Sequence, residues 1–149
     1  MQLARVAPWV VVGALALVPG CASIRRGERA EDIREGVFFE RGAIILTGSA
    51  LTDGSGTVLA AMTGKVPNLR VQRRGGRCPE ITLRNNVSYT QDVNPDVYVD
   101  GTRSTDTCIL DQIRATDVER VEVYPQGFTT RPGYSPQATG LILVFMRSG

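Results

Sequence analysis

The chain contains no histidine, and this absence narrows the chemistry that its side chains can perform. Serine and cysteine nucleophiles usually depend on a histidine base, and histidine is also a common metal ligand. Carboxylates are the remaining acid–base candidates, for example Asp100 with Asp117, but a catalytic pair needs surroundings that separate the two pKa values. No pattern marks such surroundings, so we expect a protein that is not an enzyme, with no catalytic residue and no cofactor.

Alternating oxygen-bearing side chains at Asp92, Asn94 and Asp96 resemble the start of a calcium-binding loop. An EF-hand would continue with glycine at the sixth position and a bidentate glutamate at the twelfth. Val97 and Arg103 occupy those two positions, so the pattern does not predict an EF-hand. An irregular Ca²⁺ site among the loop acids stays open beside the simpler reading of solvated carboxylates, and we assign no metal site.

The cysteines are Cys21, Cys78 and Cys108. Cys21 ends an export signal that is described below, which leaves two cysteines in the exported part of the chain. In an oxidising compartment these two favour one disulfide, Cys78–Cys108, which would add about 3.5 kcal/mol by restricting the unfolded chain. Two free buried thiols are the alternative.

The segment 65–84 carries an excess of positive charge, because Glu80 is its one acidic residue. Its basic residues are Lys65, Arg70, Arg73, Arg74, Arg77 and Arg84. An anionic lipid, a lipopolysaccharide phosphate or an acidic protein surface could bind such a segment. A solvated strand edge, where arginines prevent edge-to-edge pairing, is the alternative.

The composition is that of a globular domain. Of the 149 residues, 42% are hydrophobic and 21% charged, and the formal net charge is +2. The length suits one domain, and the weak charge does not favour a nucleic-acid partner.

Residues 1–20 have the layout of a secretory signal peptide, with Arg5, an apolar stretch and a small-residue end. The apolar stretch is shorter than the ~20 residues that a spanning helix needs. The ending Val18-Pro-Gly-Cys21 resembles the lipobox of bacterial lipoproteins, in which the cysteine becomes the first mature residue and carries the lipid. The resemblance implies lipidation at Cys21 and, because Ala22 follows, anchoring in the outer membrane facing the periplasm. Cleavage near Ala22 as in an ordinary signal peptide is the alternative.

Residues 21–36 are rich in charges of both signs and predict a solvated tether. Residues 37–149 predict a small α+β domain of about five or six short strands in a mixed sheet, with two short helices. The expected strands are 43–47, 69–72, 81–84, 97–99, 121–124 and 141–146, and the expected helices are 57–63 and 108–114. Ser55 is the expected N-cap of the first helix. The apolar run 141–146 predicts a central strand covered on both faces.

Six segments, in this order and spacing, resemble the plug domain of TonB-dependent outer-membrane receptors. They are 45–49, 58–71, 81–85, 97–101, 117–123 and 134–144. The resemblance spans about residues 43–149 and implies a plug-like fold. Asn68, Asn85 and Thr139 stand where the family usually has glycine. In the family a 22-stranded barrel follows the plug on the same chain, whereas this sequence ends after its last plug-like strand. We therefore expect a stand-alone, plug-like lipoprotein without the barrel.

These observations predict a lipid-anchored, non-enzymatic interaction module of the cell envelope, associated with transport or export. Its partners would be the membrane, through the N-terminal lipid, and another envelope protein. The alternative is a lipoprotein that binds a small molecule or a glycan through the loops 85–95 and 125–136.

The Cys21→Ala variant tests the anchor. Without the sulfur that accepts the lipid, the chain should leave the membrane fraction and appear in the soluble periplasmic fraction. Fractionation and intact-mass measurement check this result. A variant that stays with membranes, and whose mass shows no loss of lipid relative to the parent, would rule out acylation at Cys21.

Overall fold

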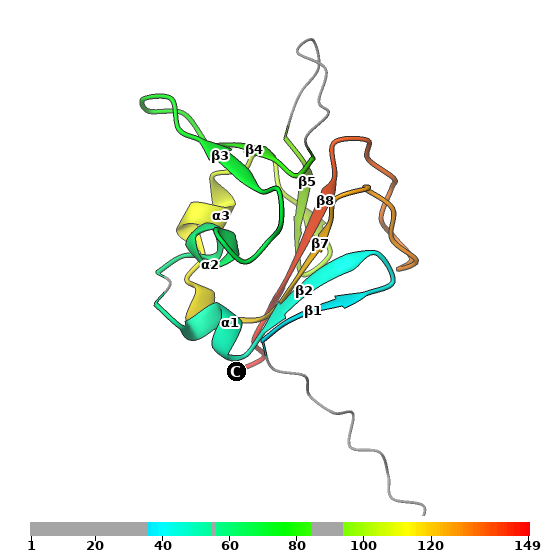
Figure 1. The fold of residues 1–149 in the computed structure, drawn as a ribbon, viewed down its shortest axis with the longest axis horizontal. Coiled ribbons are helices and arrows are strands. Elements are labelled where there is room, and N and C mark those ends of the chain that lie inside the picture. The colour runs from blue at the N-terminus through cyan, green and yellow to red at the C-terminus, as the bar shows by residue number, and fades with distance from the viewer. Residues whose placement is uncertain (1–35, 55, 85–93) are drawn as a thin grey trace, which may run out of the picture. The chain divides into compact units, whose positions relative to one another are not determined.

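The computed structural model describes residues 36–54, 56–84 and 94–149, which fold around a mixed six-stranded sheet (Figure 1). The strand order in this sheet is β1-β2-β7-β8-β5-β6. Its strands are β1 (Gly36–Glu40), β2 (Ala43–Thr47), β5 (Asp96–Val99), β6 (Thr102–Arg103), β7 (Val118–Tyr124) and β8 (Leu141–Met146). A separate antiparallel pair consists of β3 (Arg70–Gln72) and β4 (Glu80–Thr82). The predicted α+β class with a mixed sheet is confirmed.

Strand β8 lies inside the sheet, antiparallel to β7 on one side and parallel to β5 on the other. Ile142 and Val144 belong to one core cluster, and Leu141 and Leu143 belong to a second cluster. Because successive side chains of a strand point to opposite faces, the two clusters lie on the two faces of the sheet. The prediction of a central strand covered on both faces is confirmed.

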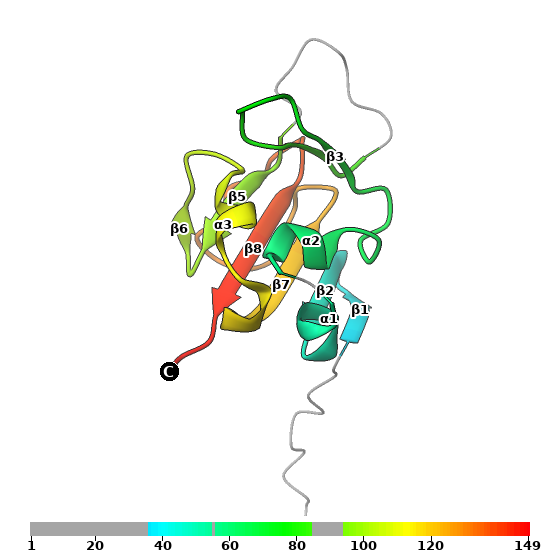
Figure 2. The same ribbon diagram turned by 90° about the vertical axis from the view of Figure 1, so that its left-hand side faces the viewer.

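Three short helices cover one face of the sheet (Figure 2). They are α1 (Ser49–Thr52), α2 (Val58–Met62) and α3 (Ile109–Gln112), and a 3₁₀ turn at Ala115–Asp117 follows α3. Leu59 and Met62 of α2 and Leu110 of α3 are fully buried in the cluster on this face. None of the described helices is long and apolar enough to cross a bilayer.

The expected N-cap at Ser55 is wrong. Helix α2 begins later, and its N-cap is Thr57, whose hydroxyl oxygen accepts a hydrogen bond from the backbone N–H of Ala60 at 3.2 Å. Thr57 has extended backbone angles, and this conformation places its side chain next to the free N–H groups of the first helical turn. Val58, the first helical residue, is fully buried, so core packing fixes the start of the helix.

The opposite face of the sheet is covered by the segment 125–140, which joins β7 to β8 on the side away from the helices (Figure 1). The ring of Tyr134 packs edge-on against Tyr98 of β5, with 4.9 Å between centroids. At the base of the segment, Gly127 donates to the carbonyl of Tyr124 and accepts from the N–H of Gln137. A side chain at Gly127 would collide with the carbonyl of Gln137, and the backbone φ of +70° also favours glycine there.

Several predicted segments lie outside the described residues. These are the signal peptide and Cys21, the tether up to residue 35, and residues 85–93 of the predicted binding loop. The other predicted binding loop, 125–136, is described and lies within the segment that covers the second face of the sheet.

Candidate interaction site

The predicted disulfide is confirmed. The sulfur atoms of Cys78 and Cys108 are 2.02 Å apart, and their Cα atoms are separated by 4.7 Å. Cys78 lies between β3 and β4, and Cys108 is the N-cap residue directly before α3. The bond therefore attaches the β3–β4 hairpin to the helical layer.

Two polar contacts attach the hairpin to the same helical segment. The hydroxyl of Thr107 donates to the carbonyl of Pro79 at 2.5 Å. One guanidinium nitrogen of Arg73 donates to both carboxylate oxygens of Asp111 at 2.8 and 2.9 Å. Together with the disulfide, these contacts hold the hairpin in one position beside α3.

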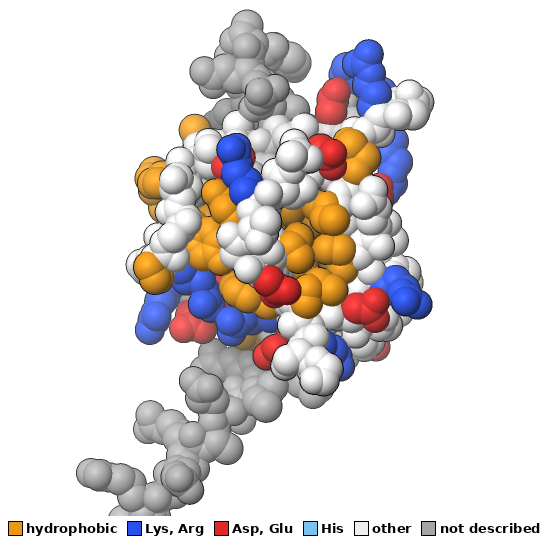
Figure 3. Space-filling view, turned by 180° about the vertical axis from the view of Figure 1, so that it is seen from behind, with side chains coloured by type: hydrophobic (Ala, Val, Ile, Leu, Met, Phe, Trp, Pro, Cys, Tyr) orange, Lys and Arg blue, Asp and Glu red, His pale blue; other side chains and the backbone are white. Residues whose placement is uncertain are grey.

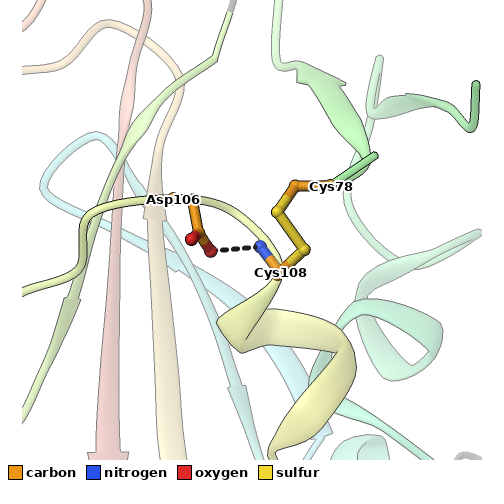
Figure 4. A group of neighbouring side chains, drawn as sticks. All are labelled: Cys78, Asp106 and Cys108. Atoms are coloured by element: carbon orange, nitrogen blue, oxygen red, sulfur yellow. Dashed lines mark hydrogen bonds between the residues drawn. A yellow bond between two sulfur atoms is a disulfide. The ribbon is translucent and has the colours of Figure 1, made fainter. Parts of the chain in front are cut away.

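Asp106 lies next to the disulfide (Figure 4). Its carboxylate and the two sulfur atoms fall within 4.8 Å of one another, a spacing that could suit a metal ion. The sulfur atoms are bonded to each other, however, and a cysteine binds a metal ion as the free thiolate. One carboxylate oxygen of Asp106 accepts the backbone N–H of Cys108 at 2.9 Å, so the side chain satisfies an amide at the start of α3.

Four of the six predicted basic residues already have polar partners within the fold. Lys65 donates to the carbonyl of Ala50, Arg73 pairs with Asp111, Arg74 lies 3.6 Å from Glu80, and Arg84 donates to the carbonyl of Ala138 at 3.2 Å.

Arg70 and Arg77 differ from these four residues. Both are exposed, and the guanidinium group of neither makes a hydrogen bond or an ion pair with any described residue. They lie on the β3–β4 hairpin, which projects from the rest of the fold (Figure 1). We call Arg70 and Arg77 the hairpin arginines. They are the part of the predicted patch that is available to an external anion.

A cavity of about 450 Å³ lies between the hairpin and the β5–β6 edge of the sheet. Its lining is mainly polar and consists of Cys78, Asn94, Pro95, Asp96, Val97, Arg103, Ser104, Thr105, Asp106 and Thr107. Arg103 donates to the carboxylate of Asp96 at 2.7 Å, and this hydrogen bond raises the pKa of the guanidinium. The cavity therefore offers both charges and several hydroxyl groups to a polar ligand.

The carboxylates considered for acid–base chemistry have separate structural partners. Asp100 accepts the backbone N–H of Met146 at 2.9 Å. Asp117 pairs with Arg114 at 3.3 Å and also accepts from the hydroxyl of Thr116.

A buried charge cluster on β7 was not predicted. Glu122 is 1% exposed, and the hydroxyl of Tyr124 donates to one of its oxygens at 2.8 Å. Two nitrogens of Arg131 donate to the two carboxylate oxygens at 2.8 and 2.6 Å. Arg120 completes the cluster, with its Nε 3.1 Å from Glu122. Because Arg131 belongs to the segment 125–140, this cluster fastens the covering segment to the sheet.

The surroundings of the cluster stabilise the protonated forms of its arginines and of Tyr124. The ring of Phe145 has the guanidinium of Arg120 at 5.0 Å and that of Arg131 at 5.1 Å, distances typical of cation–π contacts. The hydrogen bonds to Glu122 raise the pKa of Arg131, and burial raises the pKa of Tyr124. Arg131 therefore stays protonated and Tyr124 stays a hydrogen-bond donor throughout the neutral range.

The sequence signal for this cluster is weak. Arg120, Glu122 and Tyr124 occupy alternate positions of one strand, which places them on one face. A charged residue between two valines ordinarily indicates a solvent-facing position. This face is buried only because the covering segment lies over it.

Comparisons with known proteins find a similarity in fold. No family model matches this chain, and no curated protein matches its sequence. Among solved structures, a chain in the structure of the RagAB peptide importer in the "closed-closed" state has a similar fold, with a TM-score of 0.55 and 16% sequence identity. The match covers 70% of this chain but 12% of the importer chain. At this identity the likeness describes the fold alone.

The Arg131→Met variant tests the buried cluster. Methionine keeps most of the aliphatic bulk but leaves the buried carboxylate of Glu122 without its bidentate partner, which should cost about 3 kcal/mol of unfolding free energy. Urea denaturation of the variant and the parent measures this change. The control is Arg114→Met, because Arg114 pairs with Asp117 at the exposed surface and should cost at most about 1 kcal/mol. Equal losses in the two variants would contradict the assigned role of Glu122.

Proposed function

We propose that this chain is a lipid-anchored protein of the bacterial outer membrane whose plug-like domain is a non-enzymatic interaction module in a transport-related setting. The observation that carries this proposal is the fold match, over 70% of the chain, to part of a peptide importer chain. The sequence resemblance to receptor plugs covers much of the described domain. The fold and the sequence pattern therefore support the same interpretation.

The anchor would be the acylated Cys21, with the domain facing the periplasm. Acyl chains contribute about 0.8 kcal/mol per buried CH₂ group, so the domain needs no membrane-binding surface of its own. The charged segment that follows Cys21 would serve as the tether. At ~3.4 Å per extended residue, it could hold the domain at most about 50 Å from the lipid.

The partner would be an envelope protein with an acidic surface, and the hairpin arginines would contact it. A guanidinium binds carboxylates well because its donors are planar and its charge is permanent. The disulfide, Thr107 and Arg73 already fix the hairpin beside α3. Binding would therefore require little ordering of the backbone, which lowers the entropic cost of association.

A second candidate function is binding of a polar small molecule or a glycan. The cavity of about 450 Å³ favours it, because this volume suits a ligand of moderate size. The lining supplies the Asp96–Arg103 pair and the hydroxyls of Ser104, Thr105 and Thr107 as hydrogen-bonding groups.

The double variant Arg70→Ser/Arg77→Ser tests the protein-binding function. The chain is cross-linked in intact envelopes, extracted with detergent and affinity-purified, and the recovered partner is quantified by mass spectrometry. The parent should recover a partner, and the double variant should reduce its recovery by about tenfold because two charge-assisted contacts are lost. Raising the salt concentration before cross-linking should reduce recovery in the parent as well.

The matched control is Arg114→Ser, which removes an exposed arginine from another part of the surface. It should leave partner recovery unchanged. Recovery that is insensitive to the hairpin arginines would contradict the proposed contact. A chain that purifies without a protein partner but with a bound small molecule in native mass spectrometry would favour the second candidate.

A further inference from the structure

Among the described residues, strand β1 is an open edge of the six-stranded sheet. It stands first in the strand order and pairs through one side with β2 (Figures 1 and 2). Arg41 and Gly42, both with positive φ, form the two-residue turn to β2. In such a hairpin the residues that flank the turn exchange both backbone hydrogen bonds, and the pattern then alternates along the strand. The backbone N–H and C=O groups of Val37 and Phe39 therefore point away from β2, toward the open side.

The side chains of this edge are unusually apolar for an exposed strand. Among the described residues, the exposed large hydrophobics are Val37 at 40%, Phe39 at 68% and Phe128 at 67%. Two of these three lie on β1, at the positions whose backbone groups point outward. Proteins commonly protect edge strands with charges, proline or short length. Between Gly36 and Phe39, β1 has no charged residue and no proline.

The other edge of the sheet is different. Strand β6 has two residues, Thr102 and Arg103, and both are polar. Apolar side chains also gather on the face seen from behind Figure 1 (Figure 3). The hydrophobics Val99, Ile109 and Met146, on the helix-covered side of the sheet, are only partly buried, but they pack against the core cluster. Of the two edge strands, β1 is the one that itself carries exposed large hydrophobics, at positions whose outward backbone groups are unpaired among the described residues.

We propose that β1 pairs antiparallel with β1 of a second copy of this chain, with Phe38 on the two-fold axis. In this register Val37 of each copy exchanges backbone hydrogen bonds with Phe39 of the other. This pairing uses the outward-pointing groups of both strands. It also places the exposed side chain of Phe39 beside Val37 of the second copy, a cross-strand pair of the kind that stabilises sheets.

The charges and the length of β1 favour a second copy as the occupant. In the centred register Glu40 faces Gly36 of the other copy, so no like charges meet. All five residues of the strand are paired, from Gly36 to Glu40. A shift by two residues toward the turn would leave only residues 38–40 paired with one another. The strand is therefore complementary to itself in one register.

Cysteine cross-linking tests the register in the full, membrane-anchored chain. Phe38→Cys places two thiols directly opposite each other across the two-fold axis, at a non-hydrogen-bonded pair with ~4.5 Å between Cα atoms. Diamide oxidation should then convert most of the chain to a covalent dimer on a non-reducing gel. Glu40→Cys is the control, because residue 40 faces residue 36 of the other copy and its thiols lie too far apart to bond. No dimer from Phe38→Cys, or equal yields from the two variants, would overturn the register.

Sedimentation of the full chain in detergent tests the pairing without a new cysteine. Phe39→Glu puts a charge on the edge and should weaken dimerisation by ~tenfold or more. Phe128→Glu is the matched control, since Phe128 is equally exposed and lies in the segment 125–140, outside β1. It should leave dimerisation unchanged. A monomeric parent chain, or equal weakening by both variants, would overturn the proposal, and capture of a different protein at this edge would also contradict a second copy as its occupant.

Discussion

The carboxylate of Glu122 is a charge inside the fold, and one side of the molecule is organised around it. A buried carboxylate is unfavourable unless strong donors replace the water that it has lost. Two nitrogens of Arg131 and the hydroxyl of Tyr124 donate to it, and Arg120 adds a further positive charge. Arg131 can reach the carboxylate only if the segment 125–140 lies flat on the sheet. Burial of one charge on β7 therefore fixes the position of a segment that has no regular structure.

This constraint lets both faces of the central sheet become interior. The helices cover one face, and the segment 125–140 covers the other. On the helical side the Cys78–Cys108 disulfide and the contacts of Thr107 and Arg73 fix the β3–β4 hairpin in the same way. The hairpin arginines and the β1 edge are then displayed on a rigid frame. Both proposed contacts depend on that frame, because a docking surface binds more tightly when its backbone is already ordered.

The sequence predicted the parts of the fold whose patterns are local. The apolar run of β8 and the cysteine pair each carry their own signal, and the structure contains both the central strand and the disulfide. Strands β1 and β6 were missed, because β1 follows a charged segment and β6 has only two residues. Glu122 was missed because its burial depends on a distant, irregular segment. The sequence also could not show which basic residues of the predicted patch have partners within the fold. Only the structure shows that Arg70 and Arg77 are the two whose side chains are without one among the described residues.

The account requires the segment 125–140 and the central strands to open together, since one buried cluster holds both. Hydrogen exchange of the full chain, resolved to single amides, measures this most directly. The amide of Gln137, which donates to Gly127, should exchange within about tenfold of the rate of the β7 and β8 amides, at a rate set by global unfolding. Exchange at Gln137 that is several hundredfold faster, with β8 still protected, would mean that the segment opens independently, and Glu122 would then not be the constraint that organises this face.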